Sequence, residues 1–178
     1  MSNWSSVSTG IDHTCGVAEL GKAFCWGTNT AGKLGDGTTG DRNTPTDVGT
    51  VGPPDTRFTD WSSVSPGSGH SCGVRANGTV HCWGGNADGQ LGDTSITDRW
   101  VPTPVSGGFT TWSRASAGGV HSCGVRAGGA FCWGANADGQ IGNGQLMTTL
   151  LGKMLRINRA VADSNFNYGL PSDNPFAG

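Results

Sequence analysis

The stretch that decides the fold runs from residue 70 to residue 84 and reads His70-Ser-Cys-Gly-Val-Arg-Ala-Asn77-Gly78-Thr-Val-His-Cys-Trp-Gly84. Two short apolar runs flank the Asn-Gly pair, which is typical of hairpin turns whose two central residues both have positive φ. We therefore expect two antiparallel strands that place Cys72 beside Cys82. The same pattern occurs at residues 13–27 and 121–134.

These hairpins belong to a longer unit that is present three times. Each copy opens with a Trp-Ser pair, and the three tryptophans are Trp4, Trp61 and Trp112. Long repeats with many turn residues indicate arrays or propellers, because each unit buries its apolar face only against its neighbours. We predict an all-β array over residues 1–145, divided into repeats at 1–50, 51–107 and 108–145. Residues 146–178 form a tail of different character.

The hairpin tip differs among the copies. The first copy carries Leu20-Gly21 at this place, whereas the third carries Gly128-Gly129 and has one residue fewer between its cysteines. A missing residue in one strand changes the pairing of an antiparallel ladder. We expect a register shift or a bulge in the third hairpin.

The repeats resemble the RCC1 repeat family. That family carries a Gly-x-x-His-Thr element, a strand ending in Trp-Gly, and an Asn-x-x-Gly-Gln-Leu-Gly turn. The turn occurs in this chain at residues 29–35, 86–92 and 136–142. The resemblance covers about residues 1–145 and implies a β-propeller of four-stranded blades, of which the usual family member has seven.

Three blades do not close a ring, since propellers typically have about four to eight. Unpaired edges and exposed apolar faces between blades would promote aggregation. Twofold symmetry is the commonest arrangement of soluble oligomers. We therefore predict an incomplete propeller that closes by forming a homodimer.

The tail resembles a second family. Residues 150–157 read Leu-Leu-Gly-Lys-Met-Leu-Arg-Ile, and a Pro-Ser-Asp-Asn-Pro-Phe segment follows at 171–176. Both are similar to a short piece of the soluble aldose sugar dehydrogenases, which are quinone-dependent six-bladed propellers. None of the quinone or calcium ligands of that family can be placed here, so the resemblance implies no site. We expect Leu151–Ile157 to add a strand to an open blade edge.

The six cysteines form three pairs, one in each hairpin, and this even placement favours disulfides. Structural zinc sites usually space their cysteines two to four residues apart, which fits less well, and buried free thiols remain a third possibility. Disulfides would indicate an exported ancestry, although no signal segment follows Met1. The pairs are Cys15 with Cys25, Cys72 with Cys82, and Cys123 with Cys132.

Charge and hydropathy exclude some partners. The net charge is -2 and no basic run is present, so we expect no binding to nucleic acid. No apolar stretch reaches the roughly 18 residues that a membrane-spanning helix needs. We therefore expect no membrane partner.

One set of residues predicts chemistry. His13, His70 and His121 occupy the same repeat position, and the RCC1 resemblance implies that this element lies on the inner strand near the central shaft. Three imidazoles with an open fourth position resemble a catalytic zinc site. Such a metal activates water, so we predict a divalent transition metal, with zinc favoured, and hydrolysis of activated esters or phosphoesters such as phosphotriesters.

The alternative is a non-catalytic propeller that binds a protein through loops such as 51–59 and 98–108. In this interpretation the repeated histidines only pack and form hydrogen bonds. His81 aligns with Phe24 and Phe131 and is expected on a strand face. The recurring pairs Asp41-Arg42 and Asp98-Arg99 are expected either to cap turns or to be solvated ion pairs.

Overall fold

The computed structural model describes residues 3–50, 55, 57–136 and 155–157. They form three antiparallel sheets of four strands each, with the strands in chain order across every sheet. The first sheet contains β1 (Trp4–Thr9), β2 (His13–Ala18), β3 (Lys22–Gly27) and β4 (Arg42–Asp47). The second contains β5 (Trp61–Pro66), β6 (His70–Arg75), β7 (Val80–Gly84) and β8 (Arg99–Pro104), and the third β9 (Trp112–Ala117), β10 (His121–Arg126), β11 (Gly129–Gly134) and β12 (Leu155–Ile157). Two short 3-10 turns are η1 (Glu19–Gly21) and η2 (Thr30–Gly32).

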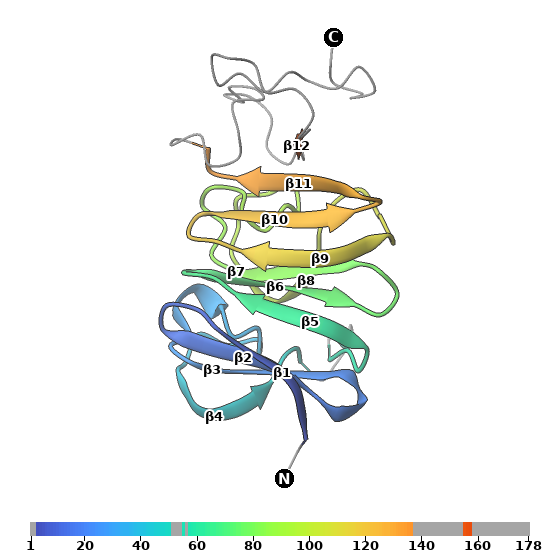
Figure 1. Cartoon of the computed structure of the whole chain (residues 1–178). Helices are drawn as coiled ribbons and strands as arrows, with labels where there is room; N and C mark the ends of the chain where they lie inside the picture. Colours follow the sequence, from blue (N-terminus) through green and yellow to red (C-terminus); the bar gives the residue numbers. More distant parts are fainter. Residues whose placement is uncertain (1–2, 51–54, 56, 137–154, 158–178) are drawn as a thin grey trace.

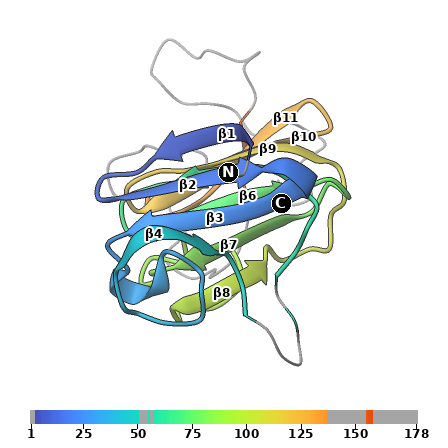
Figure 2. The same cartoon turned by 90° about the horizontal axis from the view of Figure 1, so that it is seen from below.

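The sheets stack face to face along the molecule (Figure 1). The first strands of neighbouring sheets are in contact, β1 with β5 and β5 with β9. The view from below shows the first sheet running from β1 outward to β4 (Figure 2). The sheets are thus blades whose first strands lie innermost, and they form an incomplete β-propeller, as predicted.

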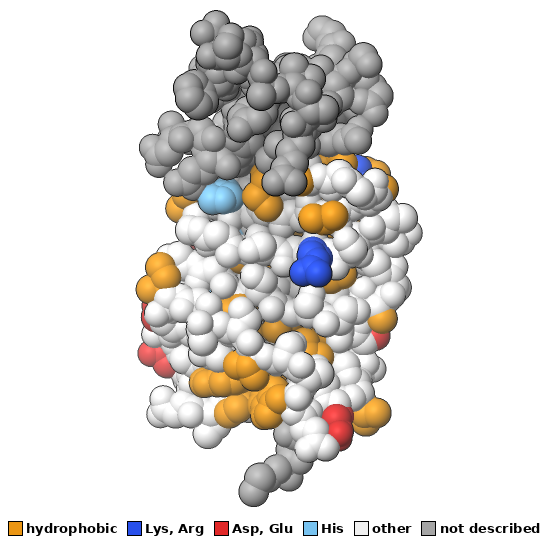
Figure 3. All heavy atoms as spheres, in the orientation of Figure 1, with side chains coloured by type: hydrophobic (Ala, Val, Ile, Leu, Met, Phe, Trp, Pro, Cys, Tyr) orange, Lys and Arg blue, Asp and Glu red, His pale blue; other side chains and the backbone are white. Residues whose placement is uncertain are grey.

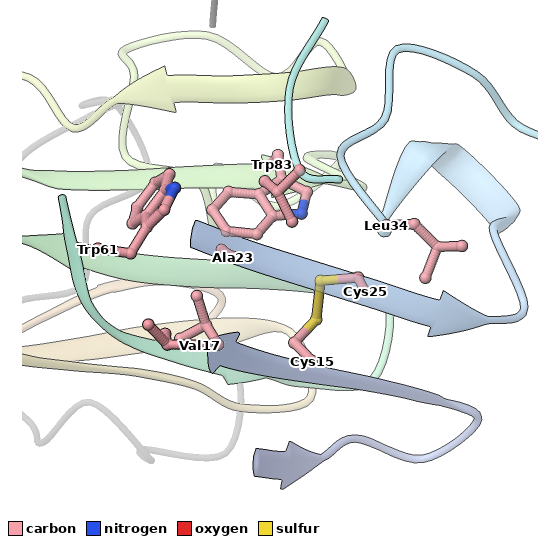
Figure 4. Packing of buried hydrophobic residues seen from close by; sticks show 9 residues of the cluster. Cys15, Val17, Ala23, Cys25, Leu34, Trp61 and Trp83 are labelled. Carbon is pink, nitrogen blue, oxygen red and sulfur yellow. A yellow bond between two sulfur atoms is a disulfide. The ribbon is translucent and has the colours of Figure 1, made fainter. Parts of the chain in front are cut away.

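Two hydrophobic clusters fill the spaces between the blades. Trp61 and Trp83 of the second blade pack against the first, where they meet the Cys15–Cys25 disulfide and Leu34 (Figure 4). Trp112 and Trp133 of the third blade pack in the same way against the second. We call the tryptophan-bearing face of a blade its leading face and the opposite face its trailing face.

The glycine of the Cys-Gly-Val element is required by this packing. A Cβ on Gly73 would lie 2.6 Å from the ring of Trp61. The corresponding distance between Gly124 and the ring of Trp112 is 2.7 Å. The indole therefore covers bare backbone, and any larger residue would move the tryptophan out of the core.

The predicted turn geometry is corrected in two places. In the second hairpin only Gly78 has positive φ, and Asn77 instead accepts a hydrogen bond from the Thr79 amide. In the third hairpin Ala127 and Gly128 both have positive φ. This two-residue turn fits the twist of the strands, so the missing residue shortens the tip and leaves the β10–β11 register continuous, and the predicted shift between these strands is wrong.

The three predicted disulfides are present, Cys15–Cys25, Cys72–Cys82 and Cys123–Cys132. Each joins residues that face one another in the register of a hairpin. The zinc and free-thiol alternatives for these cysteines are therefore wrong.

The end of the predicted tail strand completes the third blade. Strand β12 pairs with β11 in antiparallel register, with Ile157 opposite Ala130 and Leu155 opposite Cys132. The rest of the tail lies outside the described residues. In the part of the chain that the structure describes, no helix is long and apolar enough to cross a membrane.

Candidate functional site

The repeated histidines lie at the junctions between blades. His13, His70 and His121 are the first residues of β2, β6 and β10, the second strand of each blade. β2 also contacts β5, and β6 contacts β9, the first strand of the next blade. The expected place of these histidines near a central shaft stays a prediction. His13 and His70 are buried, whereas His121 in the third blade is partly exposed.

Each buried histidine contacts a serine of the next blade. His13 Nε2 lies 2.8 Å from Ser71 Oγ, and His70 Nε2 lies 2.7 Å from Ser122 Oγ. Ser71 Oγ donates to the Lys33 carbonyl over 2.9 Å, and Ser122 Oγ donates to the Gln90 carbonyl over 2.8 Å. Because a hydroxyl has one proton, the serine accepts from the imidazole. The histidines therefore carry their proton on Nε2, and Nδ1 keeps a lone pair.

A tryptophan completes each junction. Trp83 Nε1 donates to the Lys33 carbonyl over 3.0 Å, and Trp133 Nε1 donates to the Gln90 carbonyl over 2.9 Å. One backbone carbonyl thus accepts two hydrogen bonds from the following blade. The repeated His, Ser and Trp are explained as one hydrogen-bonded unit that fixes a blade against its neighbour.

A buried asparagine holds the turn that presents this carbonyl. The Asn86 side chain is fully buried, donates to Asp93 and to the Ser95 and Thr97 carbonyls, and accepts from the Leu91 amide. Asn29 makes the equivalent contacts in the first blade. The predicted role of Asp98 and Asp41 in turns is confirmed, because they accept hydrogen bonds from the backbone amides of Asn86 and Asn29. The arginines beside them form ion pairs with other aspartates, Arg99 with Asp93 and Arg42 with Asp36.

Burial keeps the junction histidines neutral. The pKa of His13 is lowered to about 4, mainly by burial and also by the nearby Lys33 charge, while Asp12 opposes the change. Burial likewise lowers the pKa of His70 to about 4, with smaller contributions from the neighbouring His121 and His13. Lys33 is itself buried and its Nζ lies 2.5 Å from Asp12, whose pKa it lowers.

The predicted metal ligands lie at successive junctions. His13 joins the first and second blades, and His70 joins the second and third. The Nδ1 atoms of all three histidines are buried without a hydrogen-bond partner among the described residues. In that part of the chain, no group of three or more His, Cys, Asp or Glu residues could hold a metal ion. The His13, His70 and His121 site remains a prediction.

The predicted strand-face role of His81 is confirmed. It lies on β7, and its ring packs against Phe58 and Trp61 with centroid distances of 5.0 and 5.9 Å. Burial lowers its pKa to about 4, helped by the charge of Arg75. His81 therefore belongs to the packing of the second blade's leading face.

Trp100 is a surface feature that the sequence analysis missed. It lies on β8 and is 50% exposed. A Cβ on Gly32 would lie 2.5 Å from its ring, and its carbonyl accepts from the Gly37 amide. The indole is thus fixed against a turn of the preceding blade while much of its surface meets solvent. Its position just after Asp98-Arg99, in a segment predicted to bind a protein, was the one sequence signal that could have identified it.

The stacked blades and their tryptophan-capped junctions define a segment of a β-propeller. Two sequence models of the Regulator of chromosome condensation (RCC1) repeat family match this chain. One matches residues 21–74 and 77–125, and the other matches residues 4–33 and 61–90. The chain belongs to the RCC1 repeat family.

Similar proteins are longer than this chain. The human probable E3 ubiquitin-protein ligase HERC4 is 33% identical over 98 residues, which are 54% of this chain and 9% of that protein. The Ultraviolet-B receptor UVR8 of Arabidopsis thaliana is 31% identical over 101 residues, 56% of this chain and 22% of the receptor. The chain thus spans less than a quarter of either relative.

Solved structures agree on the fold. Yeast RCC1 (Prp20), solved with bound Kap60, superposes with a TM-score of 0.73 at 18% identity over 89% of this chain and 37% of that one. Human WBSCR16 gives a TM-score of 0.69 at 22% identity over 86% of this chain and 38% of that one. At these identities the likeness establishes the blade architecture alone.

Proposed function

We propose that this chain is a non-catalytic, protein-binding segment of an RCC1-type propeller, and that its partner binds the outer surface of the second blade. The observation that carries the proposal is Trp100, half-exposed and held rigidly on Gly32. Ile96, which is 55% exposed, lies in the segment just before β8. Asp98–Gly108 was predicted to be a binding loop, but Arg99–Pro104 within it is the strand β8, which carries Trp100.

A rigid, exposed tryptophan is well suited to anchor a protein partner. Tryptophan is enriched among residues that dominate binding energy. Little conformational entropy is lost on binding when the side chain is already fixed. The loop before it is also fixed, because buried Asn86 bonds to three of its positions. The surface therefore combines an aromatic anchor with a preorganised polar border.

The similar structures favour a protein as the ligand. One was solved with Kap60 bound to Prp20, and another Saccharomyces cerevisiae structure of Prp20p concerns its binding to Gsp1p and histones. The net charge of -2 gives no strong preference for an acidic or basic partner. We infer a partner with an apolar pocket that accepts the indole of Trp100.

The junction histidines support the non-catalytic assignment. The Nε2 atoms of His13 and His70 are occupied by serines that bond onward to backbone carbonyls. This arrangement accounts for the repeated His-Ser and Trp residues without a reaction.

Metal-dependent hydrolysis is a second candidate, favoured by one observation. The buried Nδ1 atoms of His13, His70 and His121 lack partners among the described residues, and a bare imidazole nitrogen is a common zinc ligand. Elemental analysis of the purified protein, compared with a His70→Gln variant, tests it. Stoichiometric zinc that is lost in the variant would support the hydrolase. Zinc-free protein that stays inactive on phosphotriesters after addition of zinc would exclude it.

We infer further that the tail at 146–178 comes from a sugar dehydrogenase-like propeller. Its support is the sequence resemblance together with the pairing of β12 on β11. The described part of this tail supplies the strand β12 to the third blade.

The binding proposal is tested with Trp100→Ser and a matched control. Ile11→Ser changes an exposed apolar residue at another surface, where Ile11 is 79% exposed. Proteins captured by the wild-type chain are identified, purified and titrated against each variant. We expect Trp100→Ser to weaken binding at least tenfold while Ile11→Ser binds as the wild type. Equal binding by both variants would contradict the proposal.

A further inference from the structure

The leading face of the first blade lacks the cover that the other two leading faces have. Trp4 is 40% exposed, whereas its equivalents Trp61 and Trp112 are 3% and 5% exposed. Val7 is 54% exposed, while its equivalent Val64 is 8% exposed. Figure 3 shows hydrophobic side chains gathered at this end of the molecule, over β1. Within the described residues, no sheet packs on this side of the first blade.

The other blades show what chemistry covers such a face. Each buried leading face packs on the trailing face of the preceding blade. That trailing face is built by the hairpin disulfide, two valine or alanine positions, a turn leucine and a valine after the fourth strand. In the first blade these are Cys15, Val17, Ala23, Cys25, Leu34 and Val48, and in the second Cys72, Val74, Val80, Cys82, Leu91 and Val105.

Among the described residues, no sheet packs on the trailing face of the third blade. Val125 is partly exposed, whereas its equivalents Val17 and Val74 are 2% and 3% exposed. With Cys123 and Ala130 it lines a hollow that also includes Arg114 and Ser116 of β9 and Ser62 and Ser63 of β5. The disulfide and the two small apolar positions that help to cover a tryptophan face elsewhere are therefore present here, whereas the turn equivalent to that of Leu34 and Leu91 lies outside the described residues.

The polar groups of the junction are divided between the same two open faces. His121 stands where His13 and His70 stand, and in the described part of the chain no blade follows it to supply a serine. Thr14 and Trp26 stand where Ser71 and Trp83 stand, but among the described residues neither donates to a turn carbonyl as Ser71 and Trp83 do. The chain thus carries one half of a junction at each end of its stack.

We propose that the leading face of one copy binds the trailing face of a second copy, and reciprocally. Thr14 and Trp26 of one copy then lie against the third blade of the other, with His121 beside Thr14. Two copies supply six blades, within the range of about four to eight that closed propellers have. A contact between unlike faces closes after two copies only if the propeller axis is the twofold axis. The result is a ring with six equivalent junctions.

A second copy is the favoured occupant because it brings both missing surfaces at once. The two open faces match the packing that the chain itself uses twice between its own blades. The net charge of -2 gives little repulsion between copies. The two faces lie at the ends of the stack of described blades and share no residue with the surface around Trp100.

Native mass spectrometry and analytical ultracentrifugation of the purified chain test the proposal. We expect the wild type to be a dimer. Val7→Arg blocks the leading face and Val125→Arg the trailing face. Each variant alone should raise the dimer Kd on the order of a hundredfold, because the ring would have to bury an unpaired charge. Ile96→Arg, an exposed position on neither face, is the control and should dimerise as the wild type.

Mixing the two blocked variants identifies the contact. A Val125→Arg copy has a free leading face and a Val7→Arg copy a free trailing face, so the mixture should form a heterodimer through one junction. The proposal would be overturned if the wild type were monomeric or formed a larger oligomer. It would also be overturned if both variants dimerised as the wild type does, or if the mixture formed no heterodimer at a concentration where the wild type is fully dimeric. We expect Trp100→Ser to dimerise as the wild type does. A failure of the partner-binding proposal can therefore be distinguished from a failure of the dimer proposal.

Discussion

At the scale of single residues, Ser71 Oγ connects two blades. It accepts from His13 Nε2 and donates to the Lys33 carbonyl, and both of these residues belong to the preceding repeat. All three groups are buried, so their alternative partners in water are absent in the folded state. Loss of one buried partner costs the desolvation of the groups left behind. The hydroxyl therefore matters more to stability than its size suggests.

We predict that Ser71→Ala lowers the free energy of unfolding by about 1–3 kcal/mol. The substitution leaves the Nε2 proton of His13 without an acceptor. Ser113→Ala is the control, since this exposed hydroxyl donates to the Val125 carbonyl within its own blade, and it should change stability by less than about 0.5 kcal/mol. Urea denaturation followed by tryptophan fluorescence measures both. Equal effects would contradict the assigned role of Ser71.

The buried histidines also predict how stability depends on pH. Their folded-state pKa values, about 4 for His13, His70 and His81, lie below the unfolded value of about 6.5. Between these values the unfolded chain binds more protons, so stability falls as the pH decreases from about 6.5 to about 4. Each histidine contributes up to about 3 kcal/mol to this loss.

His81→Phe tests the pH dependence, because phenylalanine occupies this repeat position in the other two blades. The variant should lose about one third of the histidine-dependent decrease while remaining folded at neutral pH. Denaturant midpoints measured across this pH window give the slope. An unchanged slope would show that His81 does not titrate as its burial requires.

At the scale of strands and blades, close approach of an indole to bare backbone sets the spacing. Gly73 in β6 lies under Trp61, and Gly124 in β10 lies under Trp112. The Trp ring is also held at its edge by a neighbouring aromatic, Trp83 or Trp133, at 5.6 and 5.8 Å between centroids. The strand and the ring therefore form one rigid packing unit.

We predict that Gly73→Ala destabilises the protein by about 1–3 kcal/mol, as expected for an overfilled core. The new methyl group would lie 2.6 Å from the Trp61 ring and must displace it. Gly69→Ala is the matched control, because nothing lies within 4 Å of a Cβ at this position. Thermal unfolding compares the two. A larger loss in the control would contradict the packing argument.

At the scale of the whole molecule, the second blade is the only described one that has a neighbour on both faces. Its Trp83 is fully buried and bonded to the Lys33 carbonyl. Trp26 occupies the same place in the first blade, where the leading face is open. The contribution of this tryptophan to the stability of the fold therefore depends on which blade carries it.

We predict that Trp83→Ala costs about 3–5 kcal/mol, and that Trp26→Ala costs much less at low protein concentration. If two copies close a ring, the cost of Trp26→Ala rises with concentration, because association stabilises the folded wild type. Denaturation at two widely separated concentrations measures this difference. Equal costs at both positions in dilute protein would contradict the open leading face.

The repeats are plain in the amino-acid sequence, and the cysteine spacing favoured the three disulfide pairs over zinc or free thiols. The RCC1 resemblance implied the four-stranded blade, and the tail motif predicted an added strand, of which Leu155–Ile157 is described. These features depend on short spacings and on family motifs. The register shift predicted for the third hairpin is wrong. The hairpin is one residue shorter in its turn, which consists of Ala127 and Gly128, and the pairing of its strands is unchanged.

The pairs of groups that meet across blades are visible only in the folded chain. His13 and Ser71 are 58 residues apart, and three nearly identical repeats give no local signal of which serine meets which histidine. The tautomer of the imidazoles, the hold of Gly32 on Trp100 and the open faces at both ends follow from the same stacking. The physical reason is that a blade's own hydrogen bonds are local, whereas burial and the polar contacts at its faces are set by its neighbour.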